Sequence, residues 1–341
     1  MSDKTPTKQQ PVAPQDKESA SVRFTQMVMA EYGKTGTYKP TEREKQLIRN
    51  YFIAIDQTLK KAEADRVRKN ESNKDHKYDN TLPYSWNTIN LPALAQDLAH
   101  YARIGLDMLE DATLYPIPYK DNKAQKYTIT LMEGYNGIKF QAVKYALEPF
   151  EDVTVEVIYS NDKFRAIKKD SRNAVEGYEF QIPTPFDRGE PIGAFGYIQY
   201  ADQKKNKLVI FSMADIKKRK PKYASAEFWG GEKTVYENGK QVKTQLEGWL
   251  PEMIEKTMKR EIYGCKHIPR DPNKVDESYR YVQQREAQYA DMVIEAEVYD
   301  NGNAEPLELP PVELDAPSEQ PEDEPTAPLP LTDEEDPEAG F

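Results

Sequence analysis

The segment Tyr127–Tyr145, YTITLMEGYNGIKFQAVKY, is the stretch around which we expect the fold of this 341-residue chain to be organised. Its first six residues alternate and are rich in β-branched and aromatic side chains, which favours a β-strand. Gly134 and Gly137 interrupt this alternation, and apolar residues return at helical spacing from Ile138 onward. The segment therefore predicts a strand, a glycine-containing turn that holds Tyr135, and a helix.

This predicted strand–turn–helix has features that suit a nucleic acid. Glycines at such a turn let the backbone approach a ligand closely, and a helix N-terminus attracts phosphate. Basic and aromatic residues then alternate, so charges can neutralise phosphates while flat rings stack on bases. The candidates in this segment are Lys139, Lys144, Tyr135 and Tyr145. An ordinary strand–turn–helix with solvated lysines and buried aromatics has the same pattern, so both interpretations stay open here.

The composition limits the possible classes of protein. A mean hydropathy of -0.85 and 31% charged residues indicate that part of the chain lies outside any packed core. We find neither a signal peptide nor a run of about 18 apolar residues, so we expect a cytoplasmic protein. Cys265 is the single cysteine, which excludes an internal disulfide, and we interpret it as structural. Cys265 and three histidines offer no set of ligands at metal spacing, and we expect no cofactor.

The charge is divided unevenly along the chain. Residues 299–341 hold fourteen acidic residues and no Lys or Arg, so the preceding 298 residues carry a net charge of +3 although the chain total is -11. Within them, Gln203–Arg270 has sixteen basic and eight acidic residues. A basic body of this kind is compatible with a polyanionic partner. The acidic tail can be a solubility segment, a docking tail or a DNA mimic that competes for the basic body.

Local patterns predict a mixed α+β fold: a small antiparallel or mixed sheet with flanking helices. Residues 1–20 form an expected disordered leader, residues 21–90 a helical region, residues 91–298 the core, and residues 299–341 an acidic, proline-rich disordered tail. After the helix that follows Gly137, the expected strands are Val153–Ile158, Gly177–Ile182, Ile192–Tyr200, Lys207–Ser212 and a hairpin centred on Asn238-Gly239.

Three helices have clear end signals. Thr41–Glu44 is a capping box, and the next helix begins at Asn90-Leu91-Pro92 and ends near Gly105. The third runs from Trp249 to Gly264, and we expect Trp249 to pack in the core. Its Lys256, Lys259 and Arg260 lie on the polar side. Lys217–Lys220 ends another short helix, where basic residues commonly face solvent and complement the helix dipole.

Taken together, these basic clusters predict one shared groove for nucleic acid. Phe228 is a further candidate for base stacking. The predicted DNA-binding residues are Lys139, Lys144, Lys217, Lys218, Arg219, Lys256, Lys259, Arg260, Tyr135 and Trp229.

Enzymatic alternatives have little support in the sequence. There is no P-loop and no Ser/His/Asp or Cys/His arrangement in a recognisable local context. Asp187 followed by Asp202-Gln203-Lys204 is loosely similar to an Mg²⁺-dependent nuclease pattern. Such a nuclease is one alternative function, and a single-strand DNA-binding protector without annealing activity is another.

Several short motifs occur in the order and at the spacing of a known family. From about Leu91 to Gly264, the chain resembles the RecT family of phage single-strand annealing proteins. The motifs are Ile104-Gly105-Leu106-Asp107, similar to LGLD/LPLD; Leu114–Tyr119 (LYPIPY); Met132–Ile138 (MEGYNGI), similar to GYKG/GYRG; and Trp249–Arg260 (WLPEMIEKTMKR), similar to the W…MA.KTV.R helix. Asn136 departs from the pattern, because many members have a basic residue there. Two explanations of this departure stay open: Lys139 makes the phosphate contact instead, or the turn serves mainly packing.

The resemblance implies an ATP-independent annealing protein of phage recombination that has no covalent catalysis. It implies an α+β core at residues 91–298 and a basic groove that continues between subunits, with Lys256, Lys259 and Arg260 at the groove and Gly134–Lys139 nearby. Relative to the family pattern, Glu232–Lys243 is an insertion. The implied partners are single-stranded DNA, the annealed duplex intermediate, other copies of the chain in a ring or helical filament, a phage 5′–3′ exonuclease and the host single-strand-binding protein.

Overall fold

We describe the fold from a computed structural model of the chain. The residues it describes are 19–34, 39–72, 79–220, 224, 226–237 and 240–288. Residues 1–18 of the predicted leader, the acidic tail and the Asn238-Gly239 turn lie outside these residues, and the last leader residue, Ala20, begins a helix.

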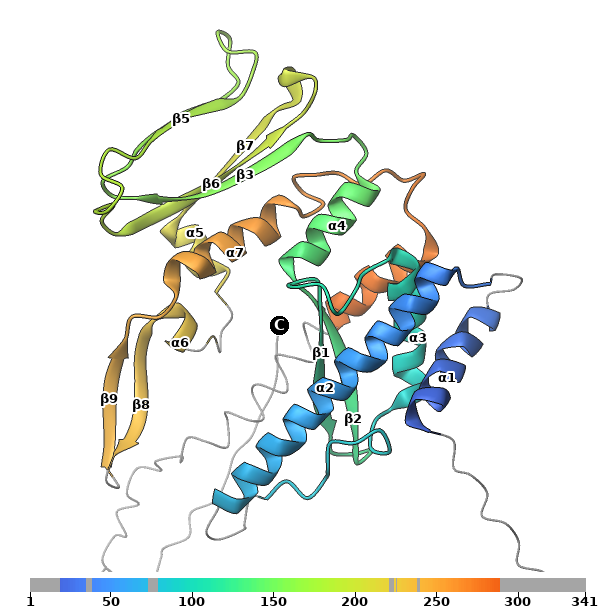
Figure 1. Cartoon of the computed structure of the whole chain (residues 1–341). Helices are drawn as coiled ribbons and strands as arrows, with labels where there is room; N and C mark the ends of the chain where they lie inside the picture. The colour runs from blue at the N-terminus through green and yellow to red at the C-terminus, as the bar shows by residue number, and fades with distance from the viewer. Residues whose placement is uncertain are drawn as a thin grey trace, which may run out of the picture.

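Three helices open the described chain: α1 (Ala20–Lys34), α2 (Glu42–Ser72) and α3 (Leu91–Ile104) (Figure 1). The capping box before α2 is confirmed, because the Thr41 amide donates to the Glu44 carboxylate at 2.6 Å and the Glu44 amide donates to the Thr41 hydroxyl at 3.2 Å. The predicted start of this helix is therefore confirmed.

Helix α3 ends at Gly105, which has a left-handed φ of 98° and whose amide donates back to the Tyr101 carbonyl at 3.0 Å. The predicted glycine C-cap is confirmed. None of the helices in the described ranges is both long and apolar enough to cross a membrane.

Strands β1 (Leu114–Asp121) and β2 (Lys126–Glu133) form an antiparallel pair beside these helices. Pro116 and Pro118 lie in β1 opposite Leu131 and Ile129. A two-stranded pair leaves each strand with one unpaired edge, which is where proline is tolerated in a sheet. Strand β1 therefore accommodates both prolines as part of a two-stranded pair.

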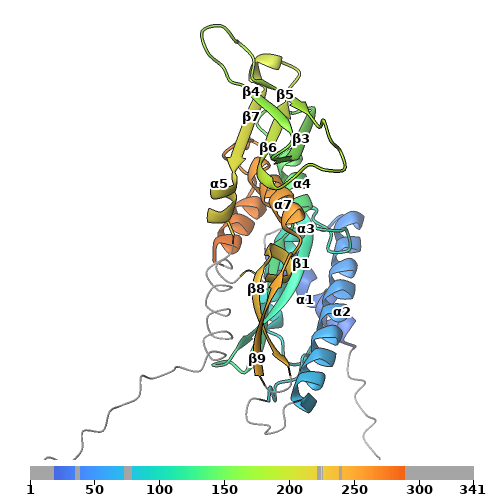
Figure 2. The same cartoon turned by 90° about the vertical axis from the view of Figure 1, so that its left-hand side faces the viewer.

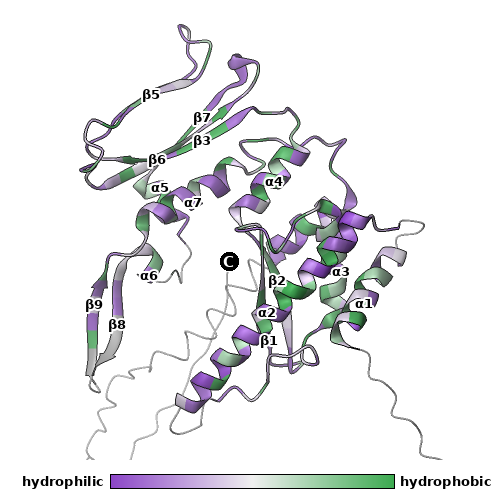
Figure 3. Cartoon of the chain, viewed as in Figure 1, coloured by the Kyte–Doolittle hydropathy of each residue, from purple (hydrophilic) through white to green (hydrophobic). Residues whose placement is uncertain are grey.

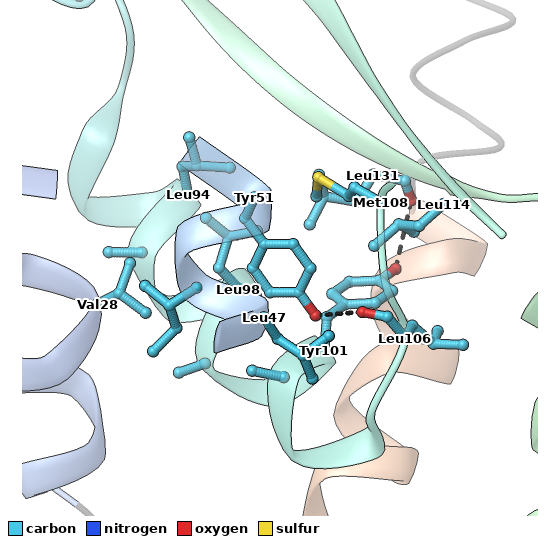
Figure 4. Close-up of a cluster of buried hydrophobic side chains, with 14 of the residues drawn as sticks. Val28, Leu47, Tyr51, Leu94, Leu98, Tyr101, Leu106, Met108, Leu114 and Leu131 are labelled. Carbon is cyan, nitrogen blue, oxygen red and sulfur yellow. Dashed lines mark hydrogen bonds between the residues drawn. The ribbon is translucent and has the colours of Figure 1, made fainter. Parts of the chain in front are cut away.

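The helices α1–α3 and the β1–β2 pair share one hydrophobic core (Figure 4). Tyr51 of α2 lies fully buried in it, and its hydroxyl donates to the Leu106 carbonyl at 2.5 Å. Tyr101 of α3 reaches the Leu131 carbonyl of β2 at 3.3 Å. Figure 3 shows apolar residues on β2, whereas the end of α2 that approaches Ser72 is largely hydrophilic. The proposed boundary at residue 90 stays a prediction, although this core extends across it.

Helix α4 (Tyr135–Tyr145) follows β2 directly, with Gly134 as its N-cap. The Ile138 amide donates to the Gly134 carbonyl at 3.1 Å and so closes the first helical turn. Tyr135 and Gly137 therefore belong to the helix, and the prediction that Tyr135 sits in a preceding turn is wrong. Tyr145 at the other end is buried in the first core, while Ala142 belongs to a second core.

The second sheet has the order β3-β6-β7 and is antiparallel throughout. Its strands are β3 (Asp152–Tyr159), β6 (Pro191–Gln199) and β7 (Lys207–Ser212). A 3-10 turn, η1 (Gln203–Lys205), lies in the predicted β6–β7 connection. All three strands confirm the sequence prediction.

A ribbon of two strands, β4 (Lys163–Ile167) and β5 (Gly177–Gln181), covers one face of this sheet through Phe164, Tyr178 and Phe180. Strand β4 was not predicted, because it has only five residues and alternates charged with apolar ones while remaining largely exposed. Figure 2 shows the ribbon against the sheet from the side.

Helices α5 (Met213–Lys218) and α7 (Leu250–Ile262) cover the opposite face of the sheet, and α6 (Ala226–Trp229) packs against α7. The hairpin β8 (Gly231–Glu237) and β9 (Lys240–Leu246) connects α6 to α7, projects away from them, and pairs only with itself among the described strands (Figure 1). Residues 277–288 are helical and pack on the first core. The predicted α+β class is confirmed.

Candidate nucleic-acid interface

Helix α7 is the element that presents the predicted basic residues. Its Ile254, Met258 and Ile262 are fully buried and pack against the β3-β6-β7 sheet and the neighbouring helices. Pro251 lies in its first turn, where proline needs no hydrogen-bond partner. The apolar face therefore fixes the rotation of the helix, and this rotation determines which side chains point outward.

The outward face of α7 carries Trp249, Lys256 and Arg260. At 3.6 residues per turn these positions fall within about 40° of one another, and they point away from Ile254 and Met258. All three are exposed. We refer to Trp249, Lys256 and Arg260 as the α7 stripe.

The two cations of the stripe differ in their local contacts. Lys256 makes no hydrogen bond or ion pair with another residue that the structure describes. Arg260 donates from Nη1 to the Glu133 carbonyl at 2.6 Å, which ties α7 to the start of α4. Beside the stripe, Lys259 pairs with Glu255 at 2.5 Å and lies 5.0 Å from the ring centroid of Tyr135. Lys256 is therefore the cation most available for a phosphate.

The two lysines predicted on α4 have different roles. Lys139 is exposed, and its ammonium lies 5.9 Å from the Tyr263 ring beside α7. Lys144 donates to the carbonyls of Ile104 at 2.7 Å and Arg103 at 3.3 Å. Partial burial lowers the pKa of Lys144. Lys144 thus hydrogen-bonds the last carbonyls of α3, whereas Lys139 faces solvent.

The glycines of the MEGYNGI motif are held against the chain's own backbone. A Cβ on Gly134 would lie 2.0 Å from the Ala112 carbonyl oxygen, and one on Gly137 would lie 2.3 Å from that of Thr113. The Asn136 amide also donates to the Ala112 carbonyl at 2.9 Å. These contacts favour the packing interpretation of the turn, because the backbone of residues 112 and 113 occupies the space beside both glycines.

Arg219, at the end of α5, joins this helix to α7. Its guanidinium donates two bonds of 3.2 Å to Glu261 and lies 4.1 Å from the Phe211 ring centroid. Lys217 and Lys218 are exposed in the last turn of the same helix. In Figure 1, α7 lies between α4 on one side and α5 with α6 on the other. The structure thus places the predicted basic residues of α4, α5 and α7 on neighbouring helices.

The aromatic candidates separate by burial. Tyr145 is buried, which leaves no ring face for a base. Trp229 packs partly against the second sheet's core, and Lys220 lies 5.7 Å from its ring centroid. Phe228 is 53% exposed and Trp249 is 63% exposed. The prediction that Trp249 lies in the core is wrong, because it caps the helix just before the buried face begins.

A buried acidic pair lies behind the stripe. The Glu133 side chain is 2% exposed, and its amide donates to the Glu286 carboxylate at 3.1 Å. Burial, and then the neighbouring Glu286, raises the pKa of Glu133 to about 8, while Arg260 acts in the opposite direction. Burial likewise raises the pKa of Glu286. No sequence pattern indicated this pair, because its members are 153 residues apart.

A model of the RecT family matches residues 90–263, which is just over half of the chain. The chain belongs to the RecT family. The match begins one residue before α3 and ends one residue after α7, so it includes every helix of the candidate interface. No curated protein and no solved structure matches the chain.

Membership in the RecT family suggests single-strand annealing in recombination, and proteins of this family are annealing proteins rather than classical enzymes. The helices α1 and α2 and the helical residues 277–288 lie outside the matched range but complete the first core. The hairpin β8–β9 lies inside it.

The two carboxylates of the predicted nuclease pattern lie far apart in this RecT-family chain. Asp187 precedes β6 and Asp202 follows it, and a nine-residue strand separates its ends by about 26 Å. The Asp202 carboxylate instead accepts the Lys204 amide at 3.0 Å and caps η1. The two carboxylates therefore cannot bind one metal ion.

Cys265, interpreted as structural, is exposed, with its Sγ 3.4 Å from the Tyr279 hydroxyl.

Proposed function

We propose that this RecT-family protein binds single-stranded DNA along the outward face of α7 and anneals complementary strands without ATP and without covalent catalysis. The observation that carries the proposal is the exposure of Lys256 and Arg260 on one face of a helix whose other face is fully buried. A rigidly held row of cations can neutralise successive phosphates and keep a strand extended.

The remaining predicted residues extend this site on both sides of α7. Lys139 on α4 and Lys217 and Lys218 on α5 add exposed charge. Lys259 and Tyr135 lie together at the junction of α4 and α7. Lys144, Arg219 and Trp229 contribute mainly by holding α3, α5 and α6 in place. These assignments remain proposals that binding measurements can test.

In the proposed mechanism, backbone contacts hold the strand while its bases stay open to a second strand. Watson–Crick pairing supplies the sequence specificity, so the protein needs no base readout, and duplex formation drives the reaction without a nucleotide. The annealed duplex remains bound as an intermediate. We further propose that copies of the chain assemble into a ring or helical filament in the bacterial cytoplasm. A phage 5′–3′ exonuclease and the host single-strand-binding protein are the proposed partners.

The deciding experiment mixes two complementary, fluorescently labelled oligonucleotides with the protein in the absence of ATP and metal. Energy transfer reports the pairing rate, and a gel run after adding Mg²⁺ reports strand length. We expect pairing faster than the spontaneous rate, with intact strands. Slower pairing would indicate a single-strand protector, and shortened strands would indicate a nuclease.

Lys256→Ala tests the location of the site, because the side chain lacks any described partner whose loss could disturb the fold. We expect weaker binding of every sequence and a salt dependence of the affinity that is shallower by about one unit of log–log slope. Lys61→Ala is the matched control, since it removes another exposed lysine, from α2. Equal behaviour of the two variants would place the DNA elsewhere.

A further inference from the structure

Trp249 and Phe228 lie together where the β8–β9 hairpin joins the helices. The Trp249 amide donates to the Phe228 carbonyl at 2.7 Å, and the Trp249 carbonyl accepts the Met253 amide at 3.0 Å in the first turn of α7. Both side chains are more than half exposed. We call Phe228 and Trp249 the aromatic pair.

The backbone beneath the aromatic pair is tightly packed. Gly230 and Gly248 have left-handed φ values of 70° and 72°. A Cβ on Gly248 would lie 2.2 Å from the Gly230 nitrogen, and one on Gly230 would lie 2.6 Å from the Glu247 carbonyl oxygen. Glycine is needed at both positions for these two reasons. The two aromatic residues are therefore held on a fixed backbone, which reduces the entropy lost when they bind a ligand.

Two exposed aromatic rings on a rigid backbone form an apolar patch without a partner in the described chain. Such patches commonly mark a binding site. Trp249 lies on the same helix face as Lys256 and Arg260, about 10 Å and 16 Å away along the axis. The next cation along this face after the tryptophan is therefore within two turns. Sites for single-stranded nucleic acid combine aromatic rings that stack on bases with cations that contact phosphates, and this helix face carries both.

We propose that the aromatic pair stacks on the bases of the single strand whose phosphates contact Lys256 and Arg260 of the α7 stripe. This inference rests on the proposed function and names the residues that take the nucleobases. Stacking uses the face of a base and is tolerant of sequence, because every base has a π-face. It also leaves the Watson–Crick edges free, as annealing of a second strand requires. Trp249 is the main contact, since its ring is the larger and the more exposed.

The test compares two labelled oligonucleotides of equal length, one of thymidines and one of abasic sites, at a single salt concentration. With the full-length chain, we expect Trp249→Ala to weaken thymidine binding by about 5- to 100-fold and to leave abasic binding unchanged. Trp249→Phe should retain most of the affinity, because it keeps an aromatic face. Lys256→Ala is the matched contrast and should weaken both oligonucleotides.

Intrinsic fluorescence gives a second measurement that does not depend on the alanine variant folding. Trp86 stacks on Phe52 at 4.8 Å and bonds Asp56 at 3.0 Å, and Trp229 is partly buried, so thymidine oligonucleotides should quench mainly Trp249. We expect this quenching to disappear in Trp249→Phe.

Four results would overturn the inference. Equal loss of thymidine and abasic binding in Trp249→Ala would mean that the ring acts through the fold. Unchanged DNA binding with a changed sedimentation coefficient would assign the aromatic pair to a contact between copies of the chain. If the wild-type chain bound neither oligonucleotide, the proposed function would fall as well, whereas wild-type binding with an indifferent Trp249→Ala would remove this inference alone.

Discussion

Replacing Gly137 by alanine separates a packing role of the MEGYNGI motif from a role in ligand binding. The added Cβ would lie 2.3 Å from the Thr113 carbonyl oxygen, whereas real Cβ contacts are at least about 3.0 Å. The first turn of α4 must therefore move by about 0.7 Å away from the backbone of residues 112 and 113. This movement also stretches the hydrogen bond from the Asn136 amide to the Ala112 carbonyl, which is 2.9 Å long.

The expected cost follows from these two effects. Overpacking against a backbone atom costs about 1–3 kcal/mol, and weakening one backbone hydrogen bond costs about 1 kcal/mol. Alanine recovers up to about 1 kcal/mol through its higher helix propensity. With that gain in full, we expect Gly137→Ala to lower the free energy of unfolding by about 1–3 kcal/mol. At about 2–4 °C per kcal/mol for a domain of this size, the thermal midpoint should fall by about 2–12 °C.

Urea unfolding followed by circular dichroism measures this difference. The control is Gly33→Ala in α1, because a Cβ on Gly33 meets no atom within 4 Å. This control should be neutral or stabilising by up to about 1 kcal/mol. Wild-type stability in Gly137→Ala, together with a loss of strand binding, would contradict the packing argument and restore a ligand role for the glycine.

Two further predictions concern the helical residues 277–288. Asp97 is 1% exposed, accepts two bonds from Arg285 at 2.8 and 2.9 Å, and accepts the Tyr281 hydroxyl at 2.6 Å. Asp97→Ala should therefore lower the free energy of unfolding by about 3–5 kcal/mol and speed hydrogen exchange in residues 277–288. Hydrogen exchange as slow as in the wild type would show that this buried pair does not anchor the helix. Between its ordinary pKa of 4.5 and the folded value of about 8, Glu133 keeps a proton that the unfolded chain releases. The free energy of unfolding should thus fall by up to about 1.4 kcal/mol per pH unit as pH rises through this window. In Glu133→Gln, the free energies of unfolding measured with urea at pH 6, 7 and 8 should depend less on pH. A slope unchanged by that substitution would assign the titration to other groups.

Most helices and most strands could be predicted because their signals are local. The capping box at Thr41 and the terminating Gly105 act on residues within one turn of themselves. The apolar spacing of α7 determined its buried face, and so also placed Lys256 and Arg260 on one outward face. Short patterns of this kind hold in any tertiary context that buries the same face.

Only the tertiary structure decided what each candidate side chain contacts. Lys144 and Lys139 are five residues apart on one helix, yet one binds the last carbonyls of α3 and the other faces solvent. Trp249 is exposed although its type favours burial, because it precedes the buried face of α7 and lies at the root of a hairpin.

The same limit applies to the buried and closely packed positions of the fold. The glycines after β2 are adjacent to Ala112 and Thr113, and Glu133 meets Glu286 from 153 residues away. Sequence patterns report neighbours a few residues apart, whereas these contacts depend on how distant segments pack. The sequence by itself therefore determined most of the secondary structure, the family resemblance and the cations of α7. The packing of distant segments decided which aromatics, glycines and carboxylates surround them.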